Sequence, residues 1–326
     1  MMTPDFPSTR TDLSLFSEKI QQLRDHIAQV IVGQQDAVEL ILTAILADGH
    51  VLLEGVPGVA KTMLAKLLAR LIDARFSRVQ FTPDLMPSDV LGTTVFNMQN
   101  SSFTFHPGPI FANIVLVDEI NRAPAKTQAA LFEVMEERQA TVDGERHPMG
   151  PLYTILATQN PVEQEGTYKL PEAQLDRFMM KITMGYPSVD DEVEILNRHL
   201  TRSFSVSLDS VEPVLSQEDI LALRQTLQQV YVEPTLLRYI AQVTEQTRQS
   251  KTIFLGASPR ASVATMQASR AYALLQGRDF VTPDDIKRVA PSVLAHRIIL
   301  TAEAEMEELT PQRVITQLLE KVEVPK

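Results

Sequence analysis

The spacing of hydrophobic residues along the chain predicts an α/β unit followed by a helical one. Hydrophobic residues recur at helical spacing over 13–30 and again over 34–47, where Gly49 ends the second pattern. Short apolar runs then alternate with helical stretches. The expected strands cover 51–54, 78–81, 113–117, 152–157 and 178–183, and the expected helices cover 61–72 and 124–138. Alternation of this kind predicts a mostly parallel sheet interleaved with helices.

Two segments that interrupt this alternation are predicted to form hairpins carried by the α/β core. Residues 82–111 are rich in proline, glycine, asparagine and aromatic residues, with strand-like fragments at 92–97 and 102–106. Residues 139–147 contain Asp143-Gly144, a dipeptide typical of tight hairpin turns. The aromatic side chains near the first hairpin could face a partner, but most are expected to pack internally: Phe81, Phe96, Phe103 and Phe105.

The last third of the chain is predicted to be a helical domain. Strand patterns stop after about residue 202, and four helical segments are expected beyond it. Their start signals are Ser216 with Asp219, Ser258 before Pro259, and Thr282 before Pro283 with Asp285. The predicted organisation is therefore an N-terminal helix within 1–33, an α/β domain over 34–202 and a helical domain over 203–326.

Composition acts mainly by excluding classes of function. The 326 residues contain no cysteine, which excludes disulfides, thiolate catalysis and cysteine-ligated metals. The six histidines show no tight metal-binding spacing. A formal charge of −11 argues against the broad basic face that binds nucleic acid regardless of sequence. Because no membrane span or signal-peptide pattern is visible, we expect a cytoplasmic protein without membrane insertion.

The peptide VLLEGVPGVAKT has the order of a phosphate-binding loop: a strand, a glycine-containing turn, then Lys-Thr opening a helix. Lys61 would reach the β and γ phosphates, and the Thr62 hydroxyl would ligate Mg²⁺. Gly55 and Gly58 permit backbone turns that side chains would obstruct. The GxxxxGK[ST] pattern has glycine at the position of Ala60, and alanine leaves room for phosphate provided that its φ is negative. The alternative is a chance glycine-rich turn.

Two later strands end in polar residues at the sheet edge where α/β proteins bind ligands. The run IVLVDE ends in Asp118, which would hold Mg²⁺ largely through water, and Glu119, which would polarise the attacking water. Its alternative is a solvated acidic turn. The run YTILATQNP ends in Asn160, a candidate hydrogen-bond partner of the γ-phosphate and of that water, or simply part of a turn. An acidic pair downstream of a lysine loop favours a nucleotide site.

Together with the peptides DEINRA, LPEAQLDRF and GASPR, these elements closely resemble the MoxR family of AAA+ ATPases. The resemblance covers nearly the whole chain from Val32-Gly33-Gln34 onward, and alanine before the lysine is usual in that family. It implies an AAA+ P-loop fold: a parallel sheet core with helix-two and pre-sensor inserts, followed by an all-helical lid domain. It also implies a hexameric ring that binds ATP with Mg²⁺ between neighbouring subunits.

Matching the family's motifs onto this sequence assigns roles residue by residue. The Walker A loop and its flanks supply the nucleotide contacts Gly55, Pro57, Gly58, Val59, Ala60, Lys61, Thr62 and Met63, with Val32 and Gly33 against the adenine. Asp118 and Glu119 fall in Walker B, Asn160 in sensor 1, Arg177 at the arginine finger donated to the neighbour's ATP, and Arg260 in sensor 2.

A guanidinium suits both arginine roles because it stabilises charge that spreads over a transferring phosphoryl group. Each arginine also has a purely structural alternative. Arg177 could pair with Asp176 or Glu172, and Arg260 could cover a lid helix. Arg122 is a weaker candidate for an interface residue.

The favoured function is a chaperone-like ATPase that remodels or matures partner proteins, plausibly with a von Willebrand factor A domain protein. A nucleic-acid translocase is the second hypothesis, although the acidic hairpin tip Asp143-Gly144-Glu145 is unsuited to tracking DNA, and no stable nucleic-acid partner is expected. An ATPase subunit of a magnesium-chelatase-like complex is the third. An inactive scaffold is disfavoured because the lysine, both carboxylates and the candidate arginine finger are all present.

Overall fold

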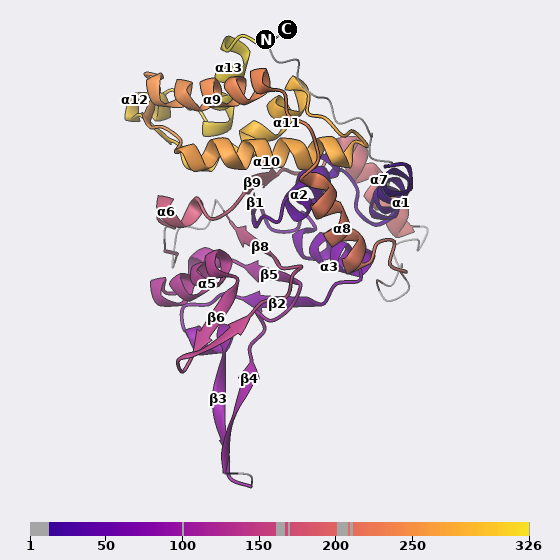
Figure 1. Ribbon diagram of the computed structural model, residues 1–326, viewed down its shortest axis with the longest axis vertical. Coiled ribbons are helices and arrows are strands. Elements are labelled where there is room, and N and C mark those ends of the chain that lie inside the picture. The colour runs from indigo at the N-terminus through magenta and orange to yellow at the C-terminus, as the bar shows by residue number, and fades with distance from the viewer. Residues whose placement is uncertain are drawn as a thin grey trace.

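The computed structural model describes residues 13–99, 101–160, 167–168, 170–200, 208 and 211–325. A central sheet with helices on both faces lies beneath a helical lid, and a long hairpin projects from the opposite side of the sheet domain (Figure 1). No helix in these ranges combines the length and apolar character needed to cross a bilayer.

The core sheet has five parallel strands in the order β2-β5-β8-β1-β9, as the alternating pattern predicts. The strands are β1 Val51–Gly55, β2 Phe76–Gln80, β5 Ile114–Asp118, β8 Thr154–Gln159 and β9 Met180–Met184. The apolar runs of the three inner strands, β5, β8 and β1, are buried on both faces, as expected for parallel strands under helices. All five carboxyl ends therefore meet at one edge of the sheet.

Alternate side chains of the three inner strands enter two separate hydrophobic clusters. On β1, Val51 and Leu53 belong to the cluster that includes the lid, whereas Leu52 belongs to the cluster beneath α5. The helices of this domain are α1 Ser14–Val30, α2 Gln35–Leu46, α3 Lys61–Leu71, α4 Pro87–Leu91, η1 Ile120–Arg122, α5 Ala125–Glu137, α6 Glu172–Leu175 and α7 Val189–Leu200.

Both predicted hairpins are present. The first pairs β3 Gly92–Asn97 with β4 Ser102–Pro107, and the second pairs β6 Gln139–Val142 with β7 Glu145–Pro148. Asp143 and Gly144 both have positive φ, 51° and 83°, as a two-residue hairpin turn requires.

The expectation that most aromatic side chains near the first hairpin pack internally is confirmed for two of them and wrong for the other two. Phe81 is fully buried, and the Phe105 ring stacks on His147 of β7. Phe96 and Phe103 pair across the two strands with ring centroids 5.1 Å apart, yet they are 48% and 74% exposed. The hairpin extends beyond the sheet domain, and no other helix or strand of the described residues lies against its outer half (Figure 1).

The lid contains more elements than the four helical segments predicted. Residues 211–325 form six α-helices and a short 3-10 helix, η3: α8 Gln217–Leu227, α9 Pro234–Gln249, α10 Pro259–Leu275, α11 Pro283–Leu294, η3 Ala295–Arg297, α12 Ala302–Met306 and α13 Pro311–Lys321. Capping boxes at Ser216 with Asp219 and at Thr282 with Asp285 confirm two of the predicted starts.

The family resemblance implied an all-helical lid, but the lid also contains one short pair of strands. Ile253–Leu255 (β10) pairs antiparallel with Ile299–Leu300 (β11), so the prediction that strands stop after residue 202 is wrong. Strands of three and two residues are too short to produce a periodic pattern. The pairing joins segments more than forty residues apart, which only the tertiary structure brings together.

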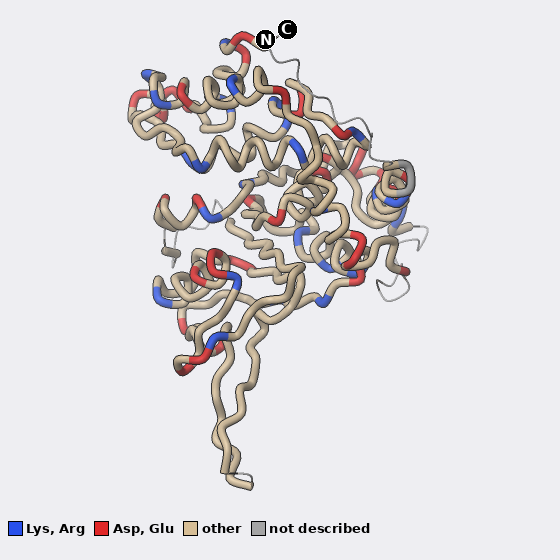
Figure 2. The backbone as a smooth tube through the Cα atoms, viewed as in Figure 1, with Lys and Arg blue, Asp and Glu red and all other residues tan. Residues whose placement is uncertain are grey.

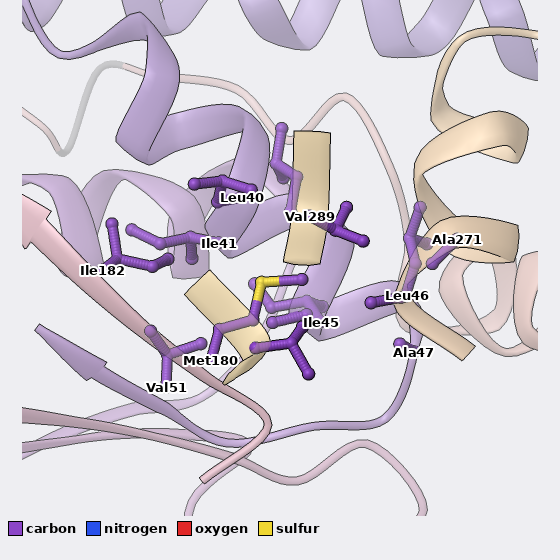
Figure 3. Close-up of a cluster of buried hydrophobic side chains, with 14 of the residues drawn as sticks. Leu40, Ile41, Ile45, Leu46, Ala47, Val51, Met180, Ile182, Ala271 and Val289 are labelled. Carbon is purple, nitrogen blue, oxygen red and sulfur yellow. The ribbon is translucent and has the colours of Figure 1, made fainter. Parts of the chain in front are cut away.

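The lid packs directly on the sheet domain through a shared hydrophobic cluster. Leu46 and Ala47 at the end of α2 lie against Ala271 of α10, and Val289 of α11 faces the same cluster, as does Met180 of β9 (Figure 3). The domain boundary near residue 202 stays a prediction.

Candidate nucleotide-binding site

A cavity of about 520 Å³ opens at the carboxyl edge of the sheet, beside the N-terminus of α3. Its volume is in the range of small-molecule sites. The residues that line it come from the ends of β2, β5 and β8, the loop after β1, helix α3 and the isolated position 208: Pro57, Gly58, Ala60, Lys61, Thr62, Met63, Lys66, Arg78, Gln80, Asp118, Glu119, Thr158, Asn160 and Leu208. Nine of the predicted site residues are thus brought together.

Two glycines give the loop after β1 its shape. A Cβ at Gly55 would lie 2.6 Å from the Met184 carbonyl oxygen, so no side chain fits there. Gly58 has φ of 88°, a conformation that residues with side chains rarely adopt. The Lys61 ammonium donates a hydrogen bond of 2.5 Å to the Gly55 carbonyl oxygen, which holds the lysine over the loop.

The backbone conformation of Ala60 differs from the prediction that alanine is tolerated at this position with a negative φ. Its φ is +61° and its ψ is 20°, in the left-handed region, so the expected negative φ is wrong. Ala60 caps α3 in this conformation, which turns the chain from the loop into the helix. An L-residue pays roughly 1–2 kcal/mol there, which gives a physical reason for the glycine of the general pattern.

The acidic pair is held by hydrogen bonds from neighbouring strands. Asp118 is buried and accepts a 2.6 Å bond from the Arg78 guanidinium and a 3.2 Å bond from the Thr158 hydroxyl. Glu119 has left-handed φ of 55° and accepts bonds from Gln80 at 2.8 Å and Arg122 at 3.1 Å. The positive φ ends the strand and turns the Glu119 side chain toward the cavity.

Lys61 and Asp118 line the same cavity, as one magnesium nucleotide requires. Partial burial lowers the pKa of Lys61, and the nearby carboxylates of Asp118 and Glu119 oppose that shift. Partial burial strengthens the attraction between the Lys61 ammonium and an anion, and the two carboxylates favour its charged form. Lys61 is therefore suited to bind a polyanion such as a triphosphate.

The oxygen donors at this edge fit magnesium bound with a nucleotide. Mg²⁺ takes oxygen ligands and retains several waters, so one or two protein oxygens together with phosphate oxygens suffice. Thr62 and Asp118 supply a hydroxyl and a carboxylate in the same cavity. When bound there, the ion would neutralise phosphate charge and orient the phosphoryl group.

Sequence reasoning missed five residues that line the cavity: Lys66, Arg78, Gln80, Thr158 and Leu208. A signal existed for some of them. Arg78 and Gln80 alternate on β2, so they share one face near the carboxyl end of that strand. Lys66 follows Thr62 by four residues on α3, which places both on one face of the helix. Leu208 carries no polar group that would have marked it as a residue of a phosphate site.

Four predicted nucleotide contacts do not line the cavity. Val59 is buried beneath the loop, and Gly55 contributes only its carbonyl to Lys61. Val32 and Gly33 lie just before α2, where a Cβ on Gly33 would come within 2.6 Å of an Asp191 carboxylate oxygen of α7. Their contact with adenine stays a prediction.

Arg177 lies at the edge of the sheet opposite the phosphate loop. It precedes β9, whose first residue Met180 pairs with Val51 at the start of β1, whereas the loop follows the end of β1 at Gly55. A strand of this length spans about 13 Å. Arg177 donates to Glu136 of α5 at 2.8 and 2.9 Å, so neither partner expected from sequence, Asp176 or Glu172, holds its guanidinium.

Arg260 lies beside Arg177 rather than beside the cavity. It is 61% exposed and lies 3.6 Å from Glu136 and 3.7 Å from Asp176. The two arginines therefore share the Glu136 carboxylate at the edge of the sheet remote from the phosphate loop. Arg122 instead bonds to Glu119 of its own chain.

Comparison with known proteins places this architecture in a family. Residues 50–180 match the ATPase family associated with various cellular activities (AAA), and residues 245–318 match the AAA lid domain. The chain is 44% identical over 309 residues to Chaperone MoxR1 of Mycobacterium tuberculosis, covering 92% of this chain and 81% of the relative. The chain belongs to the MoxR family of AAA+ ATPases.

Two further proteins are similar to this chain over nearly its whole length. Protein YeaC of Bacillus subtilis, described as uncharacterized, is 48% identical over 301 residues, covering 92% of this chain and 93% of the relative. A Cytophaga hutchinsonii protein assigned as an ATPase superposes with a TM-score of 0.87 at 41% identity, covering 95% of this chain and 96% of the other. The AAA+ P-loop fold with a parallel sheet core and a helical lid, predicted from the sequence, is thereby confirmed, apart from the short strand pair of the lid.

Proposed function

We propose that this MoxR-family chain hydrolyses ATP at a site completed by a neighbouring subunit of a ring, and uses the cycle to remodel partner proteins. The observation that carries the proposal is the division of the candidate catalytic residues between two edges of the sheet. The cavity holds Lys61, Asp118 and Glu119, whereas Arg177 and Arg260 lie together at the other edge.

Within one chain, the cavity residues divide the chemistry of phosphoryl transfer. Lys61 and the loop amides hold the phosphates, and Thr62 with Asp118 would hold magnesium. Glu119 is placed to orient and polarise the attacking water, and Asn160 to hydrogen-bond that water or the γ-phosphate. Gln80 and Arg122, which bond Glu119, set the position of its carboxylate.

A second copy supplies what one chain cannot bring to its own cavity. Arg177 and Arg260 are separated from the phosphate loop by about the length of β1, which supports the proposal that they contact ATP across an interface. An interface that joins one edge of a subunit to the opposite edge of the next is heterologous and generates a ring when it closes. We propose that this ring is the hexamer implied by the family resemblance.

The projecting hairpin supports a protein client rather than a nucleic-acid one. No Asp, Glu, Lys or Arg occurs between Asp89 and Asp118, so the hairpin carries no lysine or arginine (Figure 2). The exposed pair Phe96 and Phe103 offers an apolar contact instead. Nucleic-acid channels combine basic grooves with stacking aromatics, and the basic half is missing from this hairpin.

We further propose that the client complex includes a von Willebrand factor A domain protein. The support is the MoxR-family membership and the name of the Mycobacterium tuberculosis relative, a chaperone. Pull-down with the hydrolysis-stalled Glu119→Gln chain should recover such a protein. Recovery of no protein, together with salt-sensitive stimulation of ATP hydrolysis by single-stranded DNA, would favour a translocase instead.

Mixing of variants tests the shared site. Lys61→Ala should abolish nucleotide binding, whereas Glu119→Gln and Arg177→Ala should each bind ATP and fail to hydrolyse it. In a random mixture of the last two variants, roughly a quarter of the interfaces pair an intact cavity with an intact arginine, because the contact is heterologous. Those interfaces should hydrolyse ATP.

The control for this mixing experiment is Arg238→Ala, which removes an exposed arginine of α9. It should retain full activity by itself. If the mixture of Glu119→Gln and Arg177→Ala never exceeds the sum of its inactive parents, while both variants still associate, the arginine does not act between subunits and the proposal fails.

A further inference from the structure

The short helix η3 of the lid holds the backbone segment that carries Arg177. Arg297 of η3 is almost fully buried, with a side chain 4% exposed. Its guanidinium donates to the Asp176 carboxylate at 2.6 Å, to the Phe178 carbonyl at 2.8 Å and to the Met179 carbonyl at 3.1 Å. One side chain of the lid thus binds residues on both sides of Arg177.

A second residue of η3 reinforces this contact. His296 is buried and its Nε2 lies 3.0 Å from the Phe178 carbonyl oxygen. Burial and the neighbouring Arg297 charge lower the pKa of His296, which keeps the ring neutral. Because a carbonyl oxygen can only accept, Nε2 is the donor in this contact. The Phe178 carbonyl therefore accepts from two lid residues.

Asp176 links the two arginines of the candidate catalytic edge. One of its carboxylate oxygens pairs with Arg297, and the other lies 3.7 Å from Arg260 at the start of α10. Arg260 also approaches Glu136, to which Arg177 is bound. Lid residues thus contact the Arg177 segment through its backbone, through Asp176 and through a shared carboxylate.

We propose that Arg297 is a positioning residue for hydrolysis: it joins the lid to the 176–179 segment, so that Arg177 and Arg260 enter the neighbour's site as one unit. The inference rests on the proposed function. A displacement of the lid relative to the sheet moves Arg297 and, through three carbonyl and carboxylate contacts, moves Arg177 with it. The lid position would then set the activity of the adjacent subunit.

Arginine is the residue that this role requires. Its planar guanidinium carries five donors in a fixed geometry, whereas a lysine ammonium offers three donors at one point. Backbone carbonyls buried between α6 and β9 need partners, and Arg297 supplies them at Phe178 and Met179. Arg297→Lys should therefore keep the charge beside Asp176 and lose the hold on the backbone.

The test compares Arg297→Lys and Arg297→Ala with a matched control, Arg224→Ala. Arg224 is also a largely buried arginine that ties a lid helix to the sheet domain, through the Ile45 and Pro151 carbonyls and Asp48, but it does not contact the 176–179 segment. The measurements are the equilibrium affinity for a fluorescent ATP analogue, kcat, KM, thermal stability and subunit association for each variant.

We expect both Arg297 variants to bind nucleotide like the wild type and to lose at least about tenfold in kcat, a part of the 10³–10⁵ that an arginine finger contributes. Mixing Arg297→Lys with Glu119→Gln should restore hydrolysis, because each Arg297→Lys cavity can receive arginines from a Glu119→Gln neighbour. Mixing Arg297→Lys with Arg177→Ala should restore nothing, because both variants are defective on the same edge.

Several outcomes would overturn the inference. Wild-type kcat in Arg297→Lys would show that the contact is not needed to place Arg177. A loss of kcat in Arg297→Lys that mixing with Glu119→Gln subunits does not reverse would indicate a general defect of folding. A loss of kcat equal to that of Arg224→Ala would indicate the same. If Arg177→Ala with Glu119→Gln shows rescue while Arg297→Lys behaves in one of these ways, only the positioning role fails, and the shared site stands.

Discussion

The left-handed conformation of Ala60 makes a prediction whose sign is opposite to that of ordinary alanine-to-glycine changes. An alanine with φ of +61° costs roughly 1–2 kcal/mol relative to glycine in the folded state. Replacing Ala60 by glycine removes this strain from the folded state. It also increases the conformational freedom of the unfolded chain, which offsets about 0.4–1 kcal/mol of the stabilisation. Ala60→Gly should therefore stabilise the chain by about 0.5 kcal/mol.

Ala129 is the matched control. It is exposed like Ala60 but lies in the interior of α5, where the same substitution should cost about 1 kcal/mol. The two variants should differ by about 1.5 kcal/mol. At roughly 1.5 °C per kcal/mol for a chain of 326 residues, their melting temperatures should differ by about 2 °C.

Thermal and urea unfolding without nucleotide would measure this difference. Ala60→Val extends the test, because a β-branched residue at positive φ is strongly disfavoured and should both destabilise the loop and weaken nucleotide binding. Should Ala60→Gly destabilise the chain as much as Ala129→Gly, the backbone at Ala60 does not hold the left-handed conformation in solution, and the reasoning is refuted.

Three further outcomes are expected. Burial lowers the pKa of His50 to about 3, whereas an unfolded histidine takes up a proton near pH 6.5, so stability should fall as pH drops through that window. The loss from pH 7.5 to 5 should be about 2 kcal/mol, and urea unfolding of His50→Gln should show a shallower pH dependence. Tyr153→Phe removes a buried hydroxyl that has no partner among the described residues, and should raise the free energy of unfolding by about 1 kcal/mol; a decrease would contradict this. Replacing Phe96 and Phe103 together by serine should reduce client capture in pull-down, whereas Val263→Ser, an equally exposed apolar site in the lid, should not.

The contiguous parts of the site were predictable from sequence because the chemistry and the chain order coincide. The loop from Gly55 to Thr62 joins strand β1 to helix α3, and Asp118-Glu119 lies at the carboxyl end of the buried strand β5. Parallel strands bring such ends to one edge without further information. The sheet, both hairpins and two capping boxes follow from patterns within ten or fifteen residues.

The sequence by itself therefore determined the sheet, the phosphate loop and the family resemblance, whereas tertiary structure decided which distant side chains meet. Glu136 of α5 pairs with Arg177, which follows α6, and Arg260 of the lid approaches the same carboxylate. Arg297 bonds to Asp176, from which it is separated by more than a hundred residues of sequence. The left-handed φ of Ala60 is likewise imposed by the fold, since an isolated alanine prefers negative φ. Sequence patterns reflect the conformational preferences of residues that are close in the chain. Contacts between remote segments depend instead on how whole helices and strands pack together.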